Sequence, residues 1–221
     1  MYTARNFAKQ AVGAFAGVVL FSAAASANLI NNGDFEAGNT GFTSSYAYNP
    51  GNIGPAGTYD TIANPATAHS LASSYGDHTT GSGLMMAVNG STTPNDLVWG
   101  QTVSVAAGAT YDFAAYISSW YPDSPAQMIF SVNGSTIGTL TAPMTTGVWE
   151  LAFATWNSGA STSALIEIRN ANTASGGNDF ALDDIYFGGA IFSNPVPEPG
   201  ALAILVVGLA GLGLARRRRS I

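Results

Sequence analysis

The spacing of apolar residues between positions 28 and 190 is the feature that most restricts the fold of this chain. No stretch there keeps the 3.6-residue period of an amphipathic helix, whereas several short runs alternate apolar and polar residues or are rich in β-branched and aromatic side chains. We therefore expect an all-β domain. The predicted strands lie at residues 84–88, 97–105, 110–118, 127–132, 135–140, 148–156, 164–169 and 180–187.

Turn signals between these runs favour a two-sheet antiparallel sandwich of the jelly-roll or Greek-key type. The dipeptides Asn133-Gly134 and Asn89-Gly90 predict type I′ turns, because both central residues of such a turn need a positive φ. Residues 42–82 differ from the rest: Gly, Pro, Asn, Ser and Tyr dominate them and periodicity is weak. Long loops of this kind are usually functional or partly disordered.

The N-terminus has the features of a secretory signal peptide. Arg5 and Lys9 precede an apolar run that ends in Ala25-Ser26-Ala27, whose small residues signal peptidase accepts. The run is too short to cross comfortably a hydrocarbon core of about 30 Å. We predict that residues 1–27 are a signal peptide, cleaved before Asn28; a permanent N-terminal anchor is the alternative.

The C-terminus predicts a short membrane-sorting tail. The segment Val196-Pro197-Glu198-Pro199 is followed by an apolar run at residues 200–215 and then by Arg216-Arg217-Arg218-Arg219. Because guanidinium groups are costly to carry across a bilayer, they should stay in the cytoplasm and leave the middle of the chain on the far side. A single helix over the apolar run would be shorter than the ~30 Å core, which suits a transient membrane stop.

These three features in this order resemble the PEP-CTERM sorting signal of Gram-negative bacteria. The resemblance implies that residues 195–221 hold the protein in the inner membrane until an exosortase cleaves it near Pro197-Glu198-Pro199. It further implies delivery to the cell surface or to an exopolysaccharide matrix. An ordinary C-terminal membrane anchor behind a Pro-rich linker is the alternative.

The remaining residues, 28–194, form the predicted ectodomain and are strongly acidic. They include twelve of the thirteen Asp and Glu residues of the chain but only one Lys or Arg, Arg169, for a net charge of about −11. Such a surface repels phosphate, so nucleic acid is not an expected partner, whereas divalent cations are attracted. The chain has no cysteine, so burial must stabilise the domain without disulfides, and metal binding is a further candidate.

The two ends of the predicted ectodomain carry a second resemblance. Residues 28–36 and 178–185 look like the first and last strands of carbohydrate-binding-module-like jelly rolls of the galactose-binding-like superfamily. Residues 98–103 and 147–149 fit its typical strand openings. The resemblance implies a jelly roll over most of residues 28–188. It leaves the ligand open, because the superfamily includes both sugar binders and domains that bind no sugar.

The same resemblance implies a structural Ca²⁺ ion. In related modules, carboxylates of the first and last strands bind the ion. The resemblance therefore implies Glu36 and Asp183 as ligands, with Asp34 and Asp184 as further candidates. Carboxylate and carbonyl oxygens are the ligands that Ca²⁺ prefers. Since side chains alternate along a strand, only one of Asp183 and Asp184 is expected to face a given neighbour. The alternative is that these four are solvated acids at strand ends.

An aromatic segment predicts a sugar-binding surface. Trp120-Tyr121-Pro122-Asp123 follows the strand predicted to end at residue 118, so it should lie in a loop with an exposed indole. Aromatic faces stack on the apolar side of sugar rings, and nearby carboxylates accept hydroxyl hydrogens. Trp120, Tyr121 and Asp123 are therefore the candidate ligand contacts, with capping of the sandwich edge as the alternative. Trp149 lies in a strand pattern and is expected to pack.

Catalysis has little support in the sequence. The two histidines, His69 and His78, lack a convincing nucleophile, and the pair Asp123 and Glu150 could occur in any acidic β protein. We expect a noncatalytic surface or matrix protein that is adhesive or structural and binds polysaccharide. Two alternatives stay open: a secreted polysaccharide hydrolase or lyase, and a structural coat protein without a small ligand.

Overall fold

The computed structural model describes residues 27–189 of the chain. The signal peptide up to Ser26, the sorting motif, its apolar segment and the arginine tail lie outside the described residues. No helix within residues 27–189 is long and apolar enough to cross a membrane. The described elements are β1 (Ala47–Tyr48), β2 (Thr58–Ile62), the 3₁₀ turn η1 (Pro65–Thr67), β3 (Met85–Asn89), β4 (Leu97–Ser104), β5 (Thr110–Tyr121), β6 (Gln127–Val132), β7 (Ser135–Thr141), β8 (Glu150–Asn157), β9 (Ser163–Asn170) and β10 (Asp179–Gly189).

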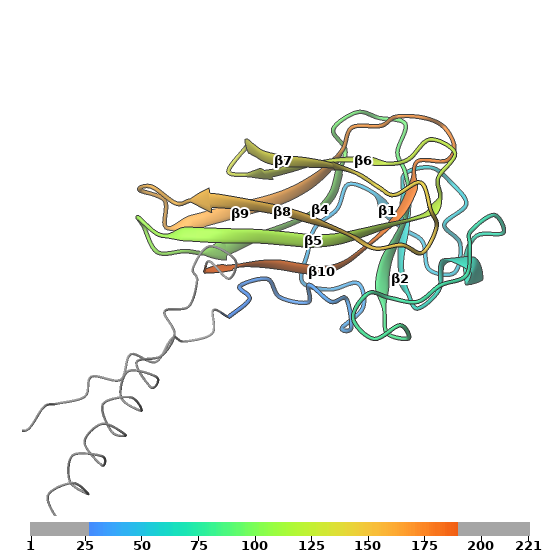
Figure 1. The fold of residues 1–221 in the computed structure, drawn as a ribbon, viewed down its shortest axis with the longest axis horizontal. Helices are drawn as coiled ribbons and strands as arrows, with labels where there is room; N and C mark the ends of the chain where they lie inside the picture. Colours follow the sequence, from blue (N-terminus) through green and yellow to red (C-terminus); the bar gives the residue numbers. More distant parts are fainter. Residues whose placement is uncertain (1–26, 190–221) are drawn as a thin grey trace, which may run out of the picture.

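The strands form the predicted two-sheet jelly-roll sandwich (Figure 1). One sheet has the order β1-β2-β3-β10-β5-β8 and the other the order β4-β9-β6-β7. Neighbouring strands run antiparallel except β1 and β2, which are parallel. All eight predicted strands are confirmed as β3 to β10. The segment at residues 42–82, predicted to be a long loop, contains β1, β2 and η1.

The core lies between the sheets because side chains alternate along each strand. In β5, Phe113, Ala115 and Ile117 are fully buried in the core, while the residues between them face the other side of the sheet. Phe130 of the opposite sheet packs on Phe113 with ring centroids 5.1 Å apart. Burial of each such large apolar side chain stabilises the fold by roughly 1.5–3 kcal/mol.

One of the two predicted Asn-Gly turns is confirmed. Asn133 and Gly134 have φ values of 50° and 77° and join β6 to β7, as a type I′ turn requires. The prediction for Asn89-Gly90 is wrong, because neither residue has a positive φ. Asn89 instead ends β3, which pairs with β2 and β10 rather than with the strand that follows it.

The two ends of the described chain lie side by side, as predicted (Figure 1). The backbone N–H of Leu29 donates to the carbonyl oxygen of Phe187 at 2.7 Å, and the N–H of Ile185 donates to Gly33 O at 2.9 Å. The prediction that residues 28–36 form a strand is wrong, since this segment makes scattered hydrogen bonds with β10, two of them through the Asn28 side chain, and has no regular strand pairing. One of its acidic residues, Asp34, nevertheless lies beside the last strand, where it lines a pocket together with Asp184.

Candidate functional site

A β-bulge in β10 determines where the adjacent acids Asp183 and Asp184 point. Asp183 pairs with Tyr116 of β5 and Tyr186 pairs with Ala114, so the register shifts between them. Asp184 takes up the irregularity with a φ of 48°. The expectation that only one of the two acids could face a given neighbour is therefore wrong: Thr79 Oγ1 lies 3.4 Å from Asp183 Oδ2 and 2.7 Å from Asp184 Oδ1.

Asp183 is a fully buried carboxyl group. Its Oδ2 accepts hydrogen bonds from the backbone N–H groups of His78 at 2.8 Å and Thr79 at 3.3 Å. Burial nevertheless raises the pKa of Asp183 to about 7, and the neighbouring Asp184 charge acts in the same direction. The ionised form of this group is therefore costly in the folded chain.

Two more carboxylates bind the loop that leads from β2 towards β3. Asp77 accepts from the N–H groups of Thr80 at 2.8 Å and Gly83 at 2.7 Å. Burial opposes ionisation of Asp77, but these hydrogen bonds hold its pKa below its usual value. Glu36 reaches the end of the same loop, where its Oε1 accepts from Leu84 N at 2.7 Å.

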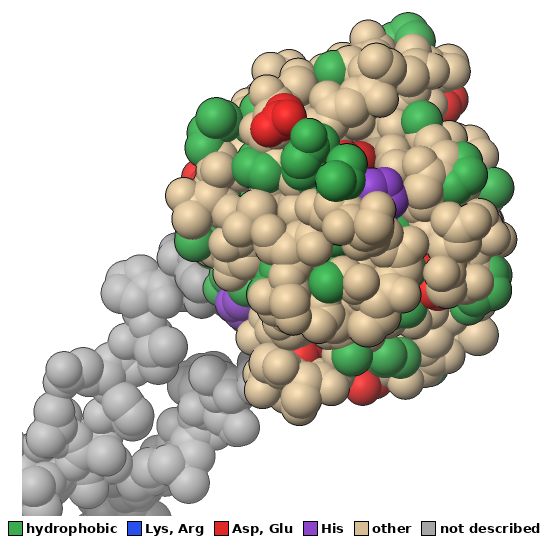
Figure 2. Space-filling model, turned by 90° about the vertical axis from the view of Figure 1, so that its right-hand side faces the viewer, with side chains coloured by type: hydrophobic (Ala, Val, Ile, Leu, Met, Phe, Trp, Pro, Cys, Tyr) green, Lys and Arg blue, Asp and Glu red, His purple; other side chains and the backbone are tan. Residues whose placement is uncertain are grey.

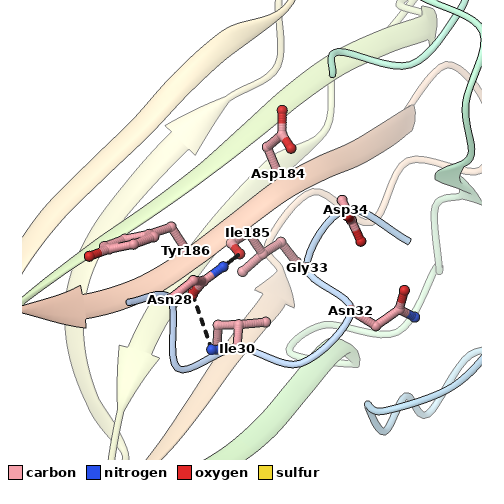
Figure 3. Close-up of a pocket in the computed structure, with 8 residues that line it drawn as sticks. All are labelled: Asn28, Ile30, Asn32, Gly33, Asp34, Asp184, Ile185 and Tyr186. Atoms are coloured by element: carbon pink, nitrogen blue, oxygen red, sulfur yellow. Dashed lines mark hydrogen bonds between the residues drawn. The ribbon is translucent and has the colours of Figure 1, made fainter. Parts of the chain in front are cut away.

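The four predicted metal ligands thus divide into two pairs. Glu36 and Asp183 contact opposite ends of the loop at residues 77–84. Asp34 and Asp184 line a surface pocket between the N-terminal segment and β10 (Figure 3). Among residues 27–189, no group of three or more His, Cys, Asp or Glu side chains is placed to hold a metal ion. Calcium binding by these four residues stays a prediction.

A cluster of aromatic rings lies next to these acids. The His78 ring stacks on Tyr116 with centroids 3.5 Å apart and planes 16° apart, and it meets Trp149 edge-on at 5.8 Å. Tyr75 also meets Trp149 edge-on, with ring centroids 6.0 Å apart. His78 Nδ1 lies 2.6 Å from Asp184 Oδ2. We call His78, Tyr116, Trp149 and Tyr75 the ring cluster.

The ring cluster covers the outer face of the six-stranded sheet. Tyr116 points away from the core because its neighbours Ala115 and Ile117 point into it. His78, Tyr116 and Trp149 are each partly exposed. Sequence reasoning missed this cluster and assigned Trp149 to packing. The alternation in β5 could have placed Tyr116 on this face, but no local signal brings His78 to it.

The prediction that Trp120 lies exposed in a loop is wrong. β5 continues to Tyr121, and Trp120 is fully buried on the outer side of the sheet beneath the segment that carries η1. Its indole Nε1 donates to Val88 O at 3.1 Å, and its ring lies against His69 with centroids 4.9 Å apart. Trp120 therefore presents no face to a ligand and serves to hold that segment on the sheet.

The neighbours of Trp120 remain accessible. Tyr121 is partly exposed and Asp123 is exposed. The Asp123 carboxylate accepts from the Tyr121 hydroxyl, and this raises the pKa of that hydroxyl group above its usual value. The two side chains are therefore close enough to act on one ligand.

Acidic groups dominate the charge of the described chain. Figure 2 shows Asp and Glu side chains but no Lys or Arg on the face that it draws. Arg169 is the one Lys or Arg residue within residues 27–189. Its Nη2 lies 2.6 Å from Glu167 Oε1, so this positive charge is already paired. That nucleic acid is not a partner stays a prediction, which rests on this charge.

The predicted sorting signal matches a known family model. The PEP-CTERM protein-sorting motif is found at residues 195–219. The chain therefore carries this motif, as its residues predicted. A search of curated proteins found no match to the chain.

Several solved structures share the fold. The Stig cyclase Fisc from Fischerella sp. TAU is 10% identical, with 75% of this chain and 98% of that chain covered and a TM-score of 0.51. The arabinofuranosidase MgGH51 is 11% identical, with 73% and 26% covered and a TM-score of 0.50. The CBM22-1 xylan-binding domain of Xyn10C from Paenibacillus barcinonensis is 15% identical, with 76% and 97% covered and a TM-score of 0.47. At these identities the likeness concerns the fold alone.

Proposed function

We propose that this chain is an exported, noncatalytic protein of the bacterial surface or extracellular matrix, and that it binds polysaccharide there. The PEP-CTERM motif supports export and sorting. In this proposal signal peptidase removes residues 1–27, the apolar segment at residues 200–215 holds the chain in the inner membrane, and an exosortase then releases it for delivery. Its role outside the cell is adhesive or structural.

The ring cluster is the observation that carries the binding proposal. Tyr116 and Trp149 offer partly exposed aromatic surface on the outer side of a rigid sheet. The Asp184 carboxylate lies beside them, held by His78 and Thr79. Aromatic surface next to a fixed hydrogen-bond acceptor is the combination that recognises a sugar ring, whose faces are apolar and whose edge carries hydroxyl groups.

Affinity electrophoresis of the full chain through gels that contain bacterial exopolysaccharide tests this proposal. We expect the parent to be retarded, and Trp149→Ala and Tyr116→Ala each to weaken binding about tenfold, the loss expected for one stacking ring. Tyr48→Ala is the matched control, because Tyr48 is an exposed ring of β1 at the opposite edge of the sheet from β8.

Two results would contradict the proposal. Equal retardation of the parent and of both ring-cluster variants would remove the cluster from ligand binding. Release of reducing ends or unsaturated sugars from the polysaccharide, abolished in Asp123→Ala or Glu150→Ala, would instead favour the hydrolase or lyase. Tyr121 and Asp123 form a second candidate contact, which Tyr121→Ala examines in the same gels.

We also propose that Glu36 and Asp183 take part in holding a structural Ca²⁺ ion, with Asp34 and Asp184 nearby. Both groups already fix the loop at residues 77–84, so an ion shared between them would tie the N-terminal segment to β10.

A further inference from the structure

The ring cluster continues into a wider apolar surface along β8. Leu151 pairs directly with Tyr116 of β5, so their side chains lie on the same outer face of the sheet. Leu151 is 37% exposed, whereas its neighbour Ala152 is buried in the core. Trp149, two residues earlier, contacts His78 on that same face. Trp149, Leu151 and Tyr116 thus form an open row, which suits the interior of a polymer chain better than a single sugar.

The loop that carries Trp149 is fixed to the sheet. The backbone N–H of Gly147 donates to Ser119 O of β5 at 3.1 Å, and Gly147 has a φ of 73°, which favours glycine. A Cβ at Gly147 would lie 3.2 Å from the Tyr75 ring, so the loop passes close to this ring. The apolar surface is therefore formed before a ligand arrives, which reduces the cost of binding.

A carboxylate lies at the margin of this apolar surface. The Asp184 side chain is 29% exposed, as is the side chain of His78, whose Nδ1 lies 2.6 Å from Asp184 Oδ2. Thr79 Oγ1 donates to the other oxygen, Asp184 Oδ1, at 2.7 Å. A carboxylate has about four lone-pair sites, so two contacts leave acceptor capacity towards solvent. Asp184 can therefore accept a hydrogen bond from a ligand and keep its contacts within the protein.

The charged side chains around Asp184 are acidic. Asp34 lines the same surface pocket as Asp184 (Figure 3). Among the described residues, the positive charge of a Lys or Arg is found only at Arg169, in β9 of the other sheet, where Glu167 pairs with it. A polysaccharide that carries carboxylate, sulfate or phosphate groups would therefore be repelled at the ring cluster.

Aromatic rings beside a carboxylate attract organic ammonium groups. A cation within about 6 Å of a ring is drawn to the negative face of that ring, and Trp and Tyr are good partners. An ammonium group also donates a charge-assisted hydrogen bond to a carboxylate, which is roughly twice as strong as a neutral one. A hydroxyl or acetamido group in the same place gains neither contribution. The site therefore favours a protonated amine over neutral sugar substituents.

We propose that the ring cluster and Asp184 select a polysaccharide that carries free amino groups, which is a hexosamine polymer that has lost N-acetyl groups. The sugar faces lie on the row of Trp149, Leu151 and Tyr116, and an ammonium group of the polymer pairs with Asp184. This inference rests on the proposed binding of polysaccharide at the ring cluster and adds the class of polysaccharide. A cationic matrix polymer also complements the net negative charge of the domain.

Calorimetric titration of the metal-free full chain with two sugar hexamers tests this inference. One is the β-1,4-linked hexamer of glucosamine, and the other is the same hexamer with every amine acetylated. We expect the parent to bind the glucosamine hexamer about tenfold more tightly, the effect of one charge-assisted contact. A hexamer of galacturonate should not bind, because its carboxylates meet an acidic surface.

Asp184→Asn removes the charge with little effect on the fold. Asparagine has nearly the same shape, can accept from Thr79 Oγ1 and tolerates the φ of 48° at this position. This variant should lose the preference for the glucosamine hexamer and keep its affinity for the acetylated one. Trp149→Ala should weaken the binding of both hexamers. Glu167→Gln, which removes one charge from the other sheet, is the matched control and should keep the preference.

The inference is overturned if the parent binds both hexamers equally, if the preference survives Asp184→Asn, or if Glu167→Gln loses it as well. Hexalysine offers six side-chain ammonium groups without sugar faces, and equally tight binding of hexalysine would show that the surface recognises basic peptides instead. Equal binding of both hexamers that Trp149→Ala weakens would leave the proposed polysaccharide binding intact. If neither hexamer binds, this inference fails, and retardation in exopolysaccharide gels decides the proposed function separately.

Discussion

His78 and Asp184 are 106 positions apart in the sequence, and their side chains meet at 2.6 Å on the outer face of the six-stranded sheet. The contact depends on the bulge in β10, which turns Asp184 towards the same loop that hydrogen-bonds to Asp183. Two adjacent residues of a central strand thus fix one loop. They thereby hold the His78 ring of that loop in place on the sheet.

The free energy of unfolding should fall as the pH rises from about 4 to 7 in the presence of a chelator. Burial raises the pKa of Asp183 to about 7 from an ordinary value of 3.8, so the folded chain binds more protons than the unfolded chain across this window. Burial also raises the pKa of Asp179, to about 6, which acts in the same direction. The Asp183 contribution amounts to at most ~4 kcal/mol.

Urea unfolding at several pH values measures this slope. Asp183→Asn should flatten it, whereas Asp123→Asn, a change at an exposed acid, should leave it in place. A parent with the same stability at pH 4 and pH 7 would show that the Asp183 carboxylate is not costly in the folded state.

Calcium should raise the thermal midpoint of the chelator-treated full chain, because an ion that binds only the folded state stabilises it by mass action. Part of this rise should be lost in Glu36→Ala and in Asp183→Ala if these carboxylates hold an ion. Differential scanning calorimetry with and without Ca²⁺ measures the rise. The same rise in these variants as in the parent would remove the acidic pair from calcium binding.

Trp120→Ala should lower the free energy of unfolding by about 3–5 kcal/mol, the usual cost of removing a fully buried large aromatic side chain. Trp120→Phe should cost less, because it keeps most of the packing and leaves only Val88 O without its donor. Urea unfolding measures both. If Trp120→Phe binds polysaccharide more weakly than the parent while remaining folded, the purely structural role assigned to this residue is wrong.

Gly134→Ala should destabilise the chain by about 1–2 kcal/mol, because the residue has a φ of 77° and an L side chain is strained there. No atom lies within 4 Å of a Cβ at this position, so the cost is conformational rather than steric. Gly176→Ala is the matched control, since its added Cβ is equally free and its φ lies outside the left-handed region. Equal thermal midpoints for the two variants would contradict this assignment.

Most of the sandwich could be predicted from the sequence because strand alternation and the Asn133-Gly134 turn are local signals. The prediction ended β5 at residue 118, before the polar Ser119, whereas the strand continues to Tyr121 and both Ser118 and Ser119 are fully buried within it. The hydroxyl group of Ser119 has no hydrogen-bond partner among the described residues. The polar character of this segment therefore led to the wrong prediction that Trp120 lies in a loop.

The candidate sites were harder to predict because they depend on contacts between distant segments. The closeness of the first and last segments followed from a resemblance and placed Glu36 and Asp183 at one loop. The ring cluster had no such guide. Tyr116 belongs to β5 and His78 to the loop between β2 and β3, and no sequence pattern specifies that their rings stack.

The course of β10 also determines how the protein would respond to force. The chain leaves the described domain at Gly189, the last residue of a strand that pairs with β5 along its length and with β3 near its start. A pull applied through the following segment runs along this inner strand, so many hydrogen bonds must shear together instead of opening one after another from an edge. A surface protein tethered through this end would therefore resist flow and mechanical stress well.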